Sequence, residues 1–186
     1  MKSPHLRPRA ELRVAMLIEN IHQDLEVWYP VFRFQEAGAR VVVVGPSVGR
    51  YTSKLGYPIE AEVDAASACS QDFDVVIVPG GYAPDLMRLC RPMVNLVREA
   101  YEGGAVVAAI CHGSWLLASA GIIRGRRVTG APSIADDLIN AGATFVDEPA
   151  VTDGRIVTSR KPSDIPQFSA ALFAAVEARR LDAAVA

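Results

Sequence analysis

Short, nearly continuous runs of apolar residues alternate along this chain with longer segments in which apolar residues recur every three or four positions. The short runs cover residues 13–18, 40–44, 74–78 and 106–110, and Val and Ile dominate them. An uninterrupted apolar run is typical of a strand covered on both faces, as in a parallel sheet between helices. The pattern therefore predicts four buried, parallel strands.

The longer segments have helical periodicity. The first carries apolar residues at helical spacing and ends at Gly38; those residues are Leu25, Trp28, Tyr29 and Phe32. Pro30 lies inside this pattern, so it must fall in the first helical turn or mark a kink. Further helices are predicted over residues 85–102, 112–120, 133–141 and 164–180. Ser133 is the expected N-cap of the fourth helix, and Asp164 with Gln167 forms a capping-box pattern at the last.

Shorter strand-like pieces follow in the last third of the chain, at residues 128–129, 144–146, 150–152 and 156–159. Asp153-Gly154 between the last two predicts a hairpin. Alternating strands and helices without a repeat or a linker predict one three-layer α/β sandwich. We expect a single domain over residues 13–180, between tails at residues 1–12 and 181–186.

Composition restricts the possible functions. The net charge of -2 provides no global positive field for nucleic acid or an anionic membrane. No apolar run approaches the ~20 residues that cross a bilayer, and the start of the chain has no signal-peptide pattern, so a cytoplasmic location is expected. Three cysteines without a Cys-x-x-Cys pair, and three histidines, favour neither a disulfide framework nor a metal site.

Cys111 is the strongest candidate for chemistry. It lies where the apolar strand at 106–110 ends and a helix begins within a residue or two. Such a turn exposes the side chain and directs helix N–H groups towards it, which predicts a lowered thiol pKa. A buried structural cysteine is the alternative. The carboxyl end of a parallel strand favours function, because ligands bind there in open α/β sheets.

Two further segments follow strands at the same expected edge. The paired Gly80 and Gly81 allow backbone N–H groups to face a ligand, as in an oxyanion hole; a tight turn with Asp85 as N-cap is the alternative. Glu26 follows the first strand and is a candidate proton carrier, or else a solvated residue of a first helical turn. Glu19, His22 and Asp24 are weaker candidates nearby.

Absent motifs also discriminate between functions. No histidine follows His112, which excludes the order of residues in amidotransferase glutaminases and in papain-type enzymes. No Gly-x-Gly-x-x-Gly or P-loop pattern indicates a nucleotide site.

These motifs together resemble the PfpI family of the ThiJ/PfpI superfamily, which is class I glutamine amidotransferase-like. The likeness runs from about Arg13 to Val176 and rests on the order of five segments. These are Glu26 with Trp28-Tyr29-Pro30, then VPGGYAPD, AICHG, SIADDLINAGA and TSRKPSD. The resemblance implies a flavodoxin-like three-layer α/β/α sandwich with a mostly parallel sheet.

The resemblance also implies roles for matching positions. Cys111 corresponds to the nucleophile, His112 to its histidine, and Glu26 to the carboxylic acid that hydrogen-bonds the sulfur. Gly81 and the main chain at His112 correspond to the oxyanion hole. Asp85 corresponds to an acid that reaches the histidine of a neighbouring subunit. Since consecutive Cys and His side chains do not easily face each other at one helix start, we expect a homo-oligomer with Asp85 near the interface.

The sequence departs from its peptidase-like relatives in the expected pocket. Some of them place a tyrosine where this chain has Ala131, which would open the pocket. Trp115 would instead close one wall, and Tyr82 would lie at the rim. Substrate size is therefore left open.

The resulting hypothesis is a cofactor-free, metal-independent enzyme that acts on small reactive carbonyls, similar to glyoxalase III or the deglycases. Cys111 would form a hemithioacetal with the aldehyde. An intracellular cysteine peptidase or amidase and a hydratase of a specialised metabolite are alternatives with the same residues. A non-catalytic sensor of oxidative stress, in which Cys111 is oxidised, is a further alternative, and a chaperone-like role is the last.

Overall fold

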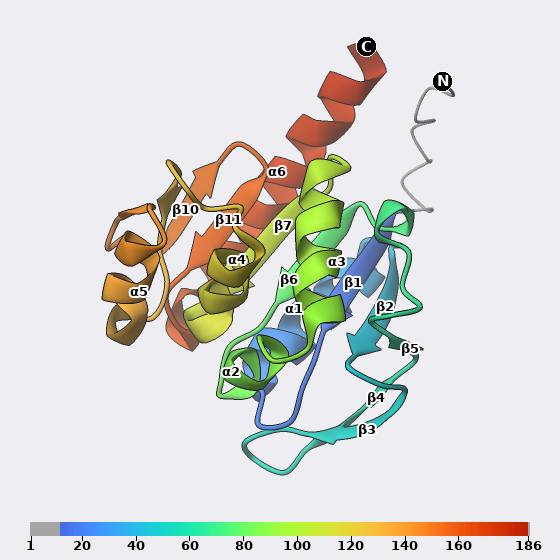
Figure 1. The fold of residues 1–186 in the computed structure, drawn as a ribbon. Coiled ribbons are helices and arrows are strands. Elements are labelled where there is room, and N and C mark those ends of the chain that lie inside the picture. The colour runs from blue at the N-terminus through green and yellow to red at the C-terminus, as the bar shows by residue number, and fades with distance from the viewer. Residues whose placement is uncertain (1–11, 186) are drawn as a thin grey trace.

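The computed structural model of this protein describes residues 12–185 and is built on a seven-stranded sheet (Figure 1). The strand order is β10-β11-β7-β6-β1-β2-β5, and every neighbouring pair is parallel except β10 with β11. The strands are β1 (Arg13–Leu17), β2 (Arg40–Gly45), β5 (Val63–Asp64), β6 (Val75–Val78), β7 (Val106–Ile110), β10 (Ala150–Asp153) and β11 (Ile156–Ser159). All four predicted apolar strands are confirmed, as are the late pair and its hairpin.

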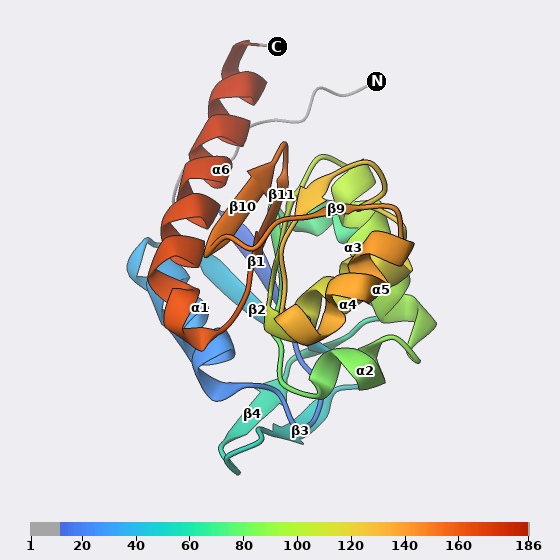
Figure 2. The ribbon, with the colours of Figure 1, turned by 90° about the vertical axis from the view of Figure 1, so that its left-hand side faces the viewer.

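Helices cover both faces of the sheet, which confirms the flavodoxin-like three-layer sandwich (Figure 2). One face carries α1 (Asp24–Glu36) and α6 (Ile165–Val185), whose Phe34 and Phe168 are fully buried against the strands. The other face carries α2 (Ala83–Met87), α3 (Arg91–Glu102), α4 (Ser114–Ala120) and α5 (Ala135–Asn140). Met87 and Leu117 belong to the second apolar cluster on that side. Burial on both faces explains why the central strands have continuous apolar sequences.

The helix predicted over residues 85–102 is wrong, because two helices, α2 and α3, divide this segment. Pro92, in the first turn of α3, has no N–H to bond the carbonyl of Arg88, so one helix cannot run through this point. Pro30 lies in the middle of α1, beyond its first turn. The carbonyl of Glu26 consequently lacks the amide that would follow four residues later.

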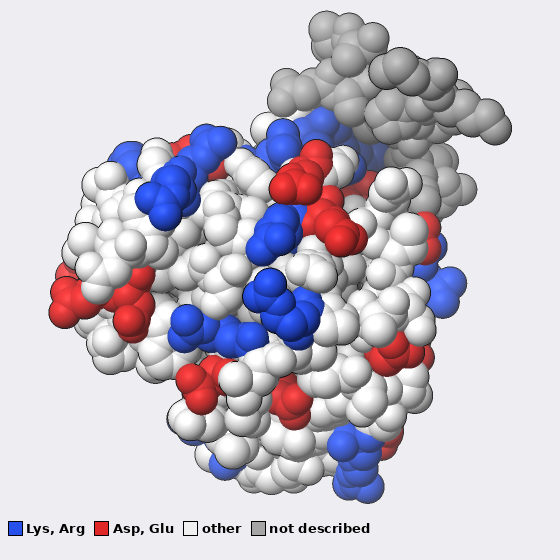
Figure 3. All heavy atoms as spheres, viewed as in Figure 1, with Lys and Arg blue, Asp and Glu red and all other residues white. Residues whose placement is uncertain are grey.

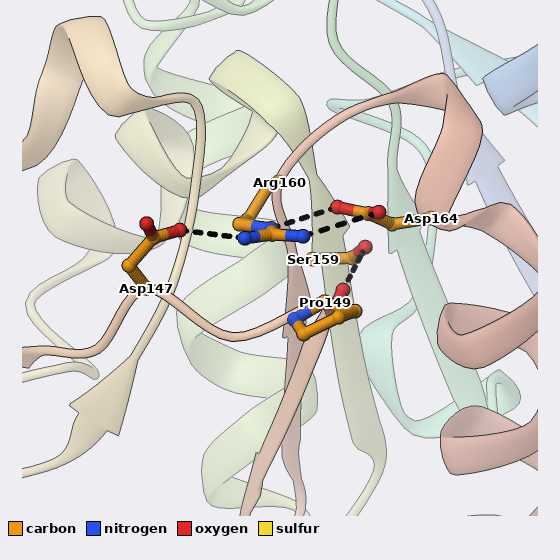
Figure 4. Close-up of polar contacts among 5 residues, drawn as sticks. All are labelled: Asp147, Pro149, Ser159, Arg160 and Asp164. Atoms are coloured by element: carbon orange, nitrogen blue, oxygen red, sulfur yellow. Dashed lines mark hydrogen bonds and ion pairs between the residues drawn. The ribbon is translucent and has the colours of Figure 1, made fainter.

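Two predicted caps are also wrong. A short 3-10 turn at Pro132–Ile134 precedes α5, whose first turn has no side-chain cap, so Ser133 does not cap it. A similar turn, Pro162–Asp164, precedes α6, and the Asp164 carboxylate accepts hydrogen bonds from Arg160 instead of forming a capping box (Figure 4). Ser133 has a long-range partner in His112, and Asp164 has a local one in Arg160. Such contacts can displace a helix cap, because capping stabilises a helix by only about 1 kcal/mol.

The expected bounds of the two tails need corrections at both ends of the domain. Residues 181–185 are not a separate tail, because α6 continues to Val185 through a segment that lacks glycine and proline. Residues 1–11 lie outside the described part of the chain. Leu12, which was assigned to the N-terminal tail, is buried, and its carbonyl accepts a hydrogen bond from the Arg40 amide.

The sequence pattern missed a small hairpin between β2 and β5. It consists of β3 (Gly49–Thr52) and β4 (Pro58–Ala61), which pair antiparallel. The signal was a short alternation of polar and apolar residues around Gly56, with Tyr51 and Ile59 buried. A second small pair, β8 (Arg127–Val128) and β9 (Thr144–Phe145), is parallel and overlaps the strand pieces expected at 128–129 and 144–146, without Thr129 and Val146.

Charge is interspersed on the face drawn in Figure 3, where Lys and Arg lie beside Asp and Glu instead of forming one basic field. In the part of the chain that the structure describes, no helix is long and apolar enough to cross a membrane.

The close approach of the start of α4 to β6 depends on Gly113. A Cβ atom at this position would overlap the Val78 carbonyl oxygen and lie 3.1 Å from that of Pro79. We expect Gly113→Ala to lower the free energy of unfolding by about 2–3 kcal/mol, measured by urea denaturation. Gly121→Ala is the matched control, because it has a φ of 77° but open space around it, and it should cost only about 1 kcal/mol. Equal losses for the two variants would contradict this packing argument.

Candidate active site

Three neighbouring strands deliver the candidate residues to one edge of the sheet. β1, β6 and β7 are adjacent and parallel, so their carboxyl ends coincide. The chain leaves β1 towards Glu26, leaves β6 at Gly80 and Gly81, and leaves β7 at Cys111. Segments far apart in sequence therefore meet at the edge where open α/β sheets bind ligands.

Cys111 occupies a sharp turn with a left-handed backbone. Its φ is 61°, an unusual value for a residue with a side chain. The Cys111 carbonyl accepts a hydrogen bond from the Ala131 amide at 3.0 Å, which anchors the turn from another element. The backbone amides of His112 and Gly81 both hydrogen-bond towards the sulfur. Strain of this kind persists only where surrounding contacts enforce it, and it is concentrated at functional sites.

Glu26 is fully buried beside this turn. Its Oε2 accepts a hydrogen bond from the Gly80 amide at 2.7 Å, and the Cys111 thiol is the side chain that hydrogen-bonds to the carboxyl. Oε1 is buried and has no nitrogen or oxygen donor among the described residues. A Cβ at Gly80 would lie 2.6 Å from the Cβ of Cys111 and 2.7 Å from Oε2 of Glu26. Only glycine allows the carboxyl and the thiol to come this close.

The pKa values of this pair move in the same direction. Burial raises the pKa of Glu26 to about 7, although the Gly80 amide, the Cys111 thiol and the charge of Lys54 oppose the shift. Burial, and then the charge of Glu26, raise the pKa of Cys111 to about 11 against the effect of the two backbone amides. The lowered thiol pKa expected from the helix start is therefore wrong. The thiol is partly buried at the wall of the cavity, and the acidic Glu26 is the charged group that acts on it.

His112 faces Cys111 directly. Its Nδ1 lies 3.3 Å from the Cys111 sulfur, and its Nε2 lies 3.1 Å from the Ser133 hydroxyl. Burial lowers the pKa of this imidazole, which favours its neutral form. The expectation that the two consecutive side chains cannot face each other is wrong, because the positive φ of Cys111 turns both towards one side.

A cavity of about 460 Å³ opens onto Cys111. Tyr82 and Trp115 line it, as the sequence analysis expected of them. Ala131, which was expected in the pocket, does not line this cavity. It is buried, and its amide donates a hydrogen bond to the Cys111 carbonyl. The complete wall is formed by Ile21, Gln23, Glu26, Lys54, Gly81, Tyr82, Cys111, His112, Trp115 and Pro162.

Trp115 is held rigidly in this wall. Its Nε1 donates a hydrogen bond to Asp137 Oδ2 at 2.8 Å, and the guanidinium of Arg88 lies 5.5 Å from its ring centre. The His112 ring meets it edge to face at a centroid distance of 5.1 Å. Contacts from three elements thus fix one apolar side of the cavity.

Pro162 enters the wall from the segment that follows β11. Arg160 holds this segment by donating hydrogen bonds to Asp147 at 2.7 Å and to Asp164 at 2.8 Å (Figure 4). The same ion pairs raise the pKa of the guanidinium. Ser159 donates a hydrogen bond to the Pro149 carbonyl at 2.6 Å, which ties β11 to the chain entering β10.

Asp85 does not line this cavity. Its carboxylate accepts a hydrogen bond from the Tyr82 phenol and thereby raises the pKa of that phenol. Within one chain, Ser133 rather than Asp85 contacts His112. The role expected for Asp85 across a subunit interface stays a prediction.

Five contributors to the site were missed from the sequence: Ile21, Gln23, Lys54, Ser133 and Pro162. Ile21 lines the cavity with a φ of 64°, a strained conformation for a β-branched residue that no sequence pattern signals. Ser133 was assigned to a helix cap. Lys54 lies on the β3–β4 hairpin, which was not predicted; the Lys-Leu-Gly sequence there indicates a turn, but nothing in it indicates a cavity residue.

The fold and the cluster together define a flavodoxin-like α/β protein with a Cys–His–Glu site at the carboxyl edge of its sheet. The chain belongs to the DJ-1/PfpI family, whose sequence profile matches residues 12–175. This finding confirms the family resemblance.

Individual relatives cover nearly the whole domain. Deglycase PH1704 from Pyrococcus horikoshii is 39% identical over 154 residues, which are 83% of this chain and 93% of the relative. Putative cysteine protease YraA from Bacillus subtilis is 35% identical over 158 residues, 84% of this chain and 94% of the relative. A two-domain DJ-1/ThiJ/PfpI-like and ferritin-like protein from Anabaena variabilis superposes with a TM-score of 0.86 at 39% identity. That match covers 88% of this chain, which spans 48% of the two-domain protein.

The buried carboxyl predicts a specific pH dependence of stability. The pKa of Glu26 is about 7 in the folded chain against an ordinary value of 4.5, so the unfolded chain loses this proton first as pH rises. The unfolding free energy should fall by about 3 kcal/mol between these two pH values and then level off. Glu26→Gln should remove this fall and be more stable than the wild type above pH ~7.

Urea denaturation over a pH series measures the effect. Glu60→Gln, at an exposed position on β4, is the control for removing one carboxylate. A wild-type stability that is flat across this window would refute the assignment of a strained, buried carboxyl.

Proposed function

We propose that this protein is a cysteine-dependent enzyme that acts on small reactive carbonyl compounds, as the deglycases and glyoxalase III do. The observation that carries the proposal is the buried Glu26 carboxyl hydrogen-bonded to the Cys111 thiol at the floor of a cavity. A carboxyl with a pKa of about 7 can both accept and return a proton near neutral pH.

The first step is addition of the thiol to the aldehyde. The Cys111 sulfur forms a bond to the aldehyde carbon as Glu26 takes the thiol proton, which offsets the high thiol pKa. The amides of Gly81 and His112, which already point at the sulfur, donate hydrogen bonds to the new alkoxide. Return of the proton to this oxygen completes the hemithioacetal.

The later steps need only proton transfer and water. In a 2-oxoaldehyde, Glu26 or neutral His112 moves the proton from the former aldehyde carbon to the neighbouring carbonyl carbon, and the hemithioacetal hydroxyl gives its proton to the neighbouring carbonyl oxygen. The product is a thioester of a 2-hydroxy acid on Cys111. Water then cleaves the thioester, releases a 2-hydroxy acid and restores the thiol. The sum is addition of one water to the 2-oxoaldehyde, without an oxidant or a cofactor.

The relatives support a deglycase-like activity. A relative that matches most of the chain is named a deglycase, and the family matches from residue 12 to residue 175. The putative cysteine protease from Bacillus subtilis supports amide cleavage as a second candidate, since the same nucleophile and oxyanion donors suit an amide. A cytoplasmic location is part of the proposal and rests on the sequence.

Turnover of methylglyoxal tests the proposal. We expect lactate formation by the wild type, none by Cys111→Ser, and a loss of about 10²–10⁴-fold in kcat for Glu26→Gln. Because Glu26 acts as a base when ionised, kcat/KM should rise as pH rises through about 7. Cys69→Ser, at an exposed free cysteine that does not line the cavity, is the matched control for the Cys111 variant.

A wild-type protein that turns over neither aldehydes nor amides, while peroxide oxidises Cys111 stoichiometrically, would overturn the enzyme in favour of an oxidation sensor.

We further propose that the enzyme is a homo-oligomer in which the Asp85 carboxylate of each chain reaches the His112 imidazole of another. Subunit complementation tests this arrangement, because Cys111→Ser and Asp85→Asn would each be inactive or severely impaired alone. Co-expressed as mixed dimers, they should recover about a quarter of wild-type activity, since half the dimers carry one complete site. A fully active monomer by light scattering would exclude this role for Asp85.

A further inference from the structure

Lys54 brings a positive charge to the reactive cavity from an element outside the catalytic strands. It lies on the turn between β3 and β4 and lines the cavity together with Glu26 and Cys111. Among the described residues, no carboxylate forms an ion pair with its ammonium group. The charge reaches the reacting groups, because it is one of the influences that oppose the effect of burial on Glu26.

The turn that carries Lys54 is anchored to the start of α1. Ser53 is buried, and its hydroxyl donates a hydrogen bond to Asp24 Oδ1 at 2.5 Å and accepts one from the Tyr57 amide at 2.9 Å. The Lys54 amide donates to the His22 carbonyl at 2.9 Å. The Ser53–Tyr57 bond closes the turn itself, whereas the bonds to Asp24 and to His22 join the turn to the start of α1 and to the segment just before it. Their effect is to hold the base of the lysine side chain beside the helix that presents Glu26.

Among the described residues that line this cavity, Glu26 is the only acidic one, and its pKa of about 7 leaves it largely uncharged below neutral pH. Burial disfavours the charged forms of both Glu26 and His112. The larger side chains of the wall are apolar or neutral: Ile21, Tyr82, Trp115 and Pro162. Lys54 is exposed and lines this cavity, so its charge borders a cleft with apolar walls and can draw an anion into it.

We propose that Lys54 binds an anionic group of the substrate, so that this site acts on aldehydes that carry a carboxylate or a phosphate. The inference rests on the proposed function in taking Cys111 as the reacting group. The aldehyde lies over Cys111 at the floor of the cavity, and the anionic group lies towards the hairpin. Lys54 is thus a specificity-determining residue, and the carbonyl chemistry itself does not require it.

Alkylation of Cys111 tests the charge preference without any turnover. Iodoacetate and iodoacetamide are nearly the same size and differ in charge, so the ratio of their rates reports the local attraction for an anion. We expect Lys54→Gln to lower this ratio by about five- to tenfold, and Lys54→Arg to keep it within about twofold. High salt should lower the wild-type ratio.

Arg50→Gln is the matched control, because it removes one positive charge from exposed β3 of the same hairpin without touching the cavity wall. It should leave the ratio unchanged. The inference is overturned if Lys54→Gln leaves the ratio at the wild-type value, or if Arg50→Gln lowers it equally.

Turnover supplies the second arm. Phenylglyoxal and 4-carboxyphenylglyoxal form a neutral and an anionic pair. The wild type should prefer the anion in kcat/KM, and Lys54→Gln should lose that preference by about five- to tenfold, mainly through KM. If the enzyme turns over both compounds without a preference, the role of Lys54 is contradicted and the proposed function is not. A protein that turns over neither compound contradicts the proposed function, and the alkylation ratio then still decides whether Lys54 attracts anions to Cys111.

Discussion

The contact of the Glu26 carboxyl with Gly80 and Cys111 is the constraint on which the rest of the site depends. It joins the segments that follow three adjacent strands, and it exists only because Gly80 has no side chain to separate the carboxyl from the thiol. A buried carboxyl is unfavourable for folding in its charged form. The protein thus retains a destabilising group at a place where proton transfer needs it, a common compromise at active sites.

The strained backbone of Cys111 has the same origin. A left-handed residue at the end of β7 turns the thiol and the His112 imidazole towards one cavity, and the Ala131 amide holds this turn. The tight packing of Gly113 against β6 allows the helix to begin immediately afterwards. The geometry brings the Glu26 carboxyl, the Cys111 thiol and two backbone amides to one point, without lowering the thiol pKa in advance. Activation is therefore expected at the moment of reaction, by proton transfer to Glu26.

The β3–β4 hairpin adds Lys54 to a site whose other main residues follow strands of the central sheet. It contributes no strand to the central sheet, yet Ser53 hydrogen-bonds to Asp24 of α1, and the Lys54 amide hydrogen-bonds to the His22 carbonyl just before that helix. Chemistry at the sheet edge and recognition by the hairpin are thus separate structural features. Such a division lets substrate choice change through a surface loop while the reacting groups stay in place.

Local patterns in the sequence were sufficient for six of the seven strands of the central sheet, for the three layers and for the position of Cys111 at a strand end; the short edge strand β5 was not predicted. Continuous apolar runs determine buried parallel strands, and the ends of those strands determine which residues can meet, since parallel strands share one carboxyl edge. Side-chain partners were decided only in three dimensions. Ser133 contacts His112 instead of capping a helix, Ala131 supports Cys111 from outside the cavity, and Lys54 reaches the site from a short hairpin.

The pKa of the Cys111 thiol shows most clearly what the sequence determined and what the tertiary structure decided. The sequence by itself determined that Cys111 stands at a strand–helix turn, because that follows from neighbouring residues. Only the tertiary structure decided that burial and a facing carboxyl outweigh the helix start and raise the thiol pKa. Desolvation depends on everything that surrounds a group, and the residues that bury Cys111 come from segments far apart along the chain.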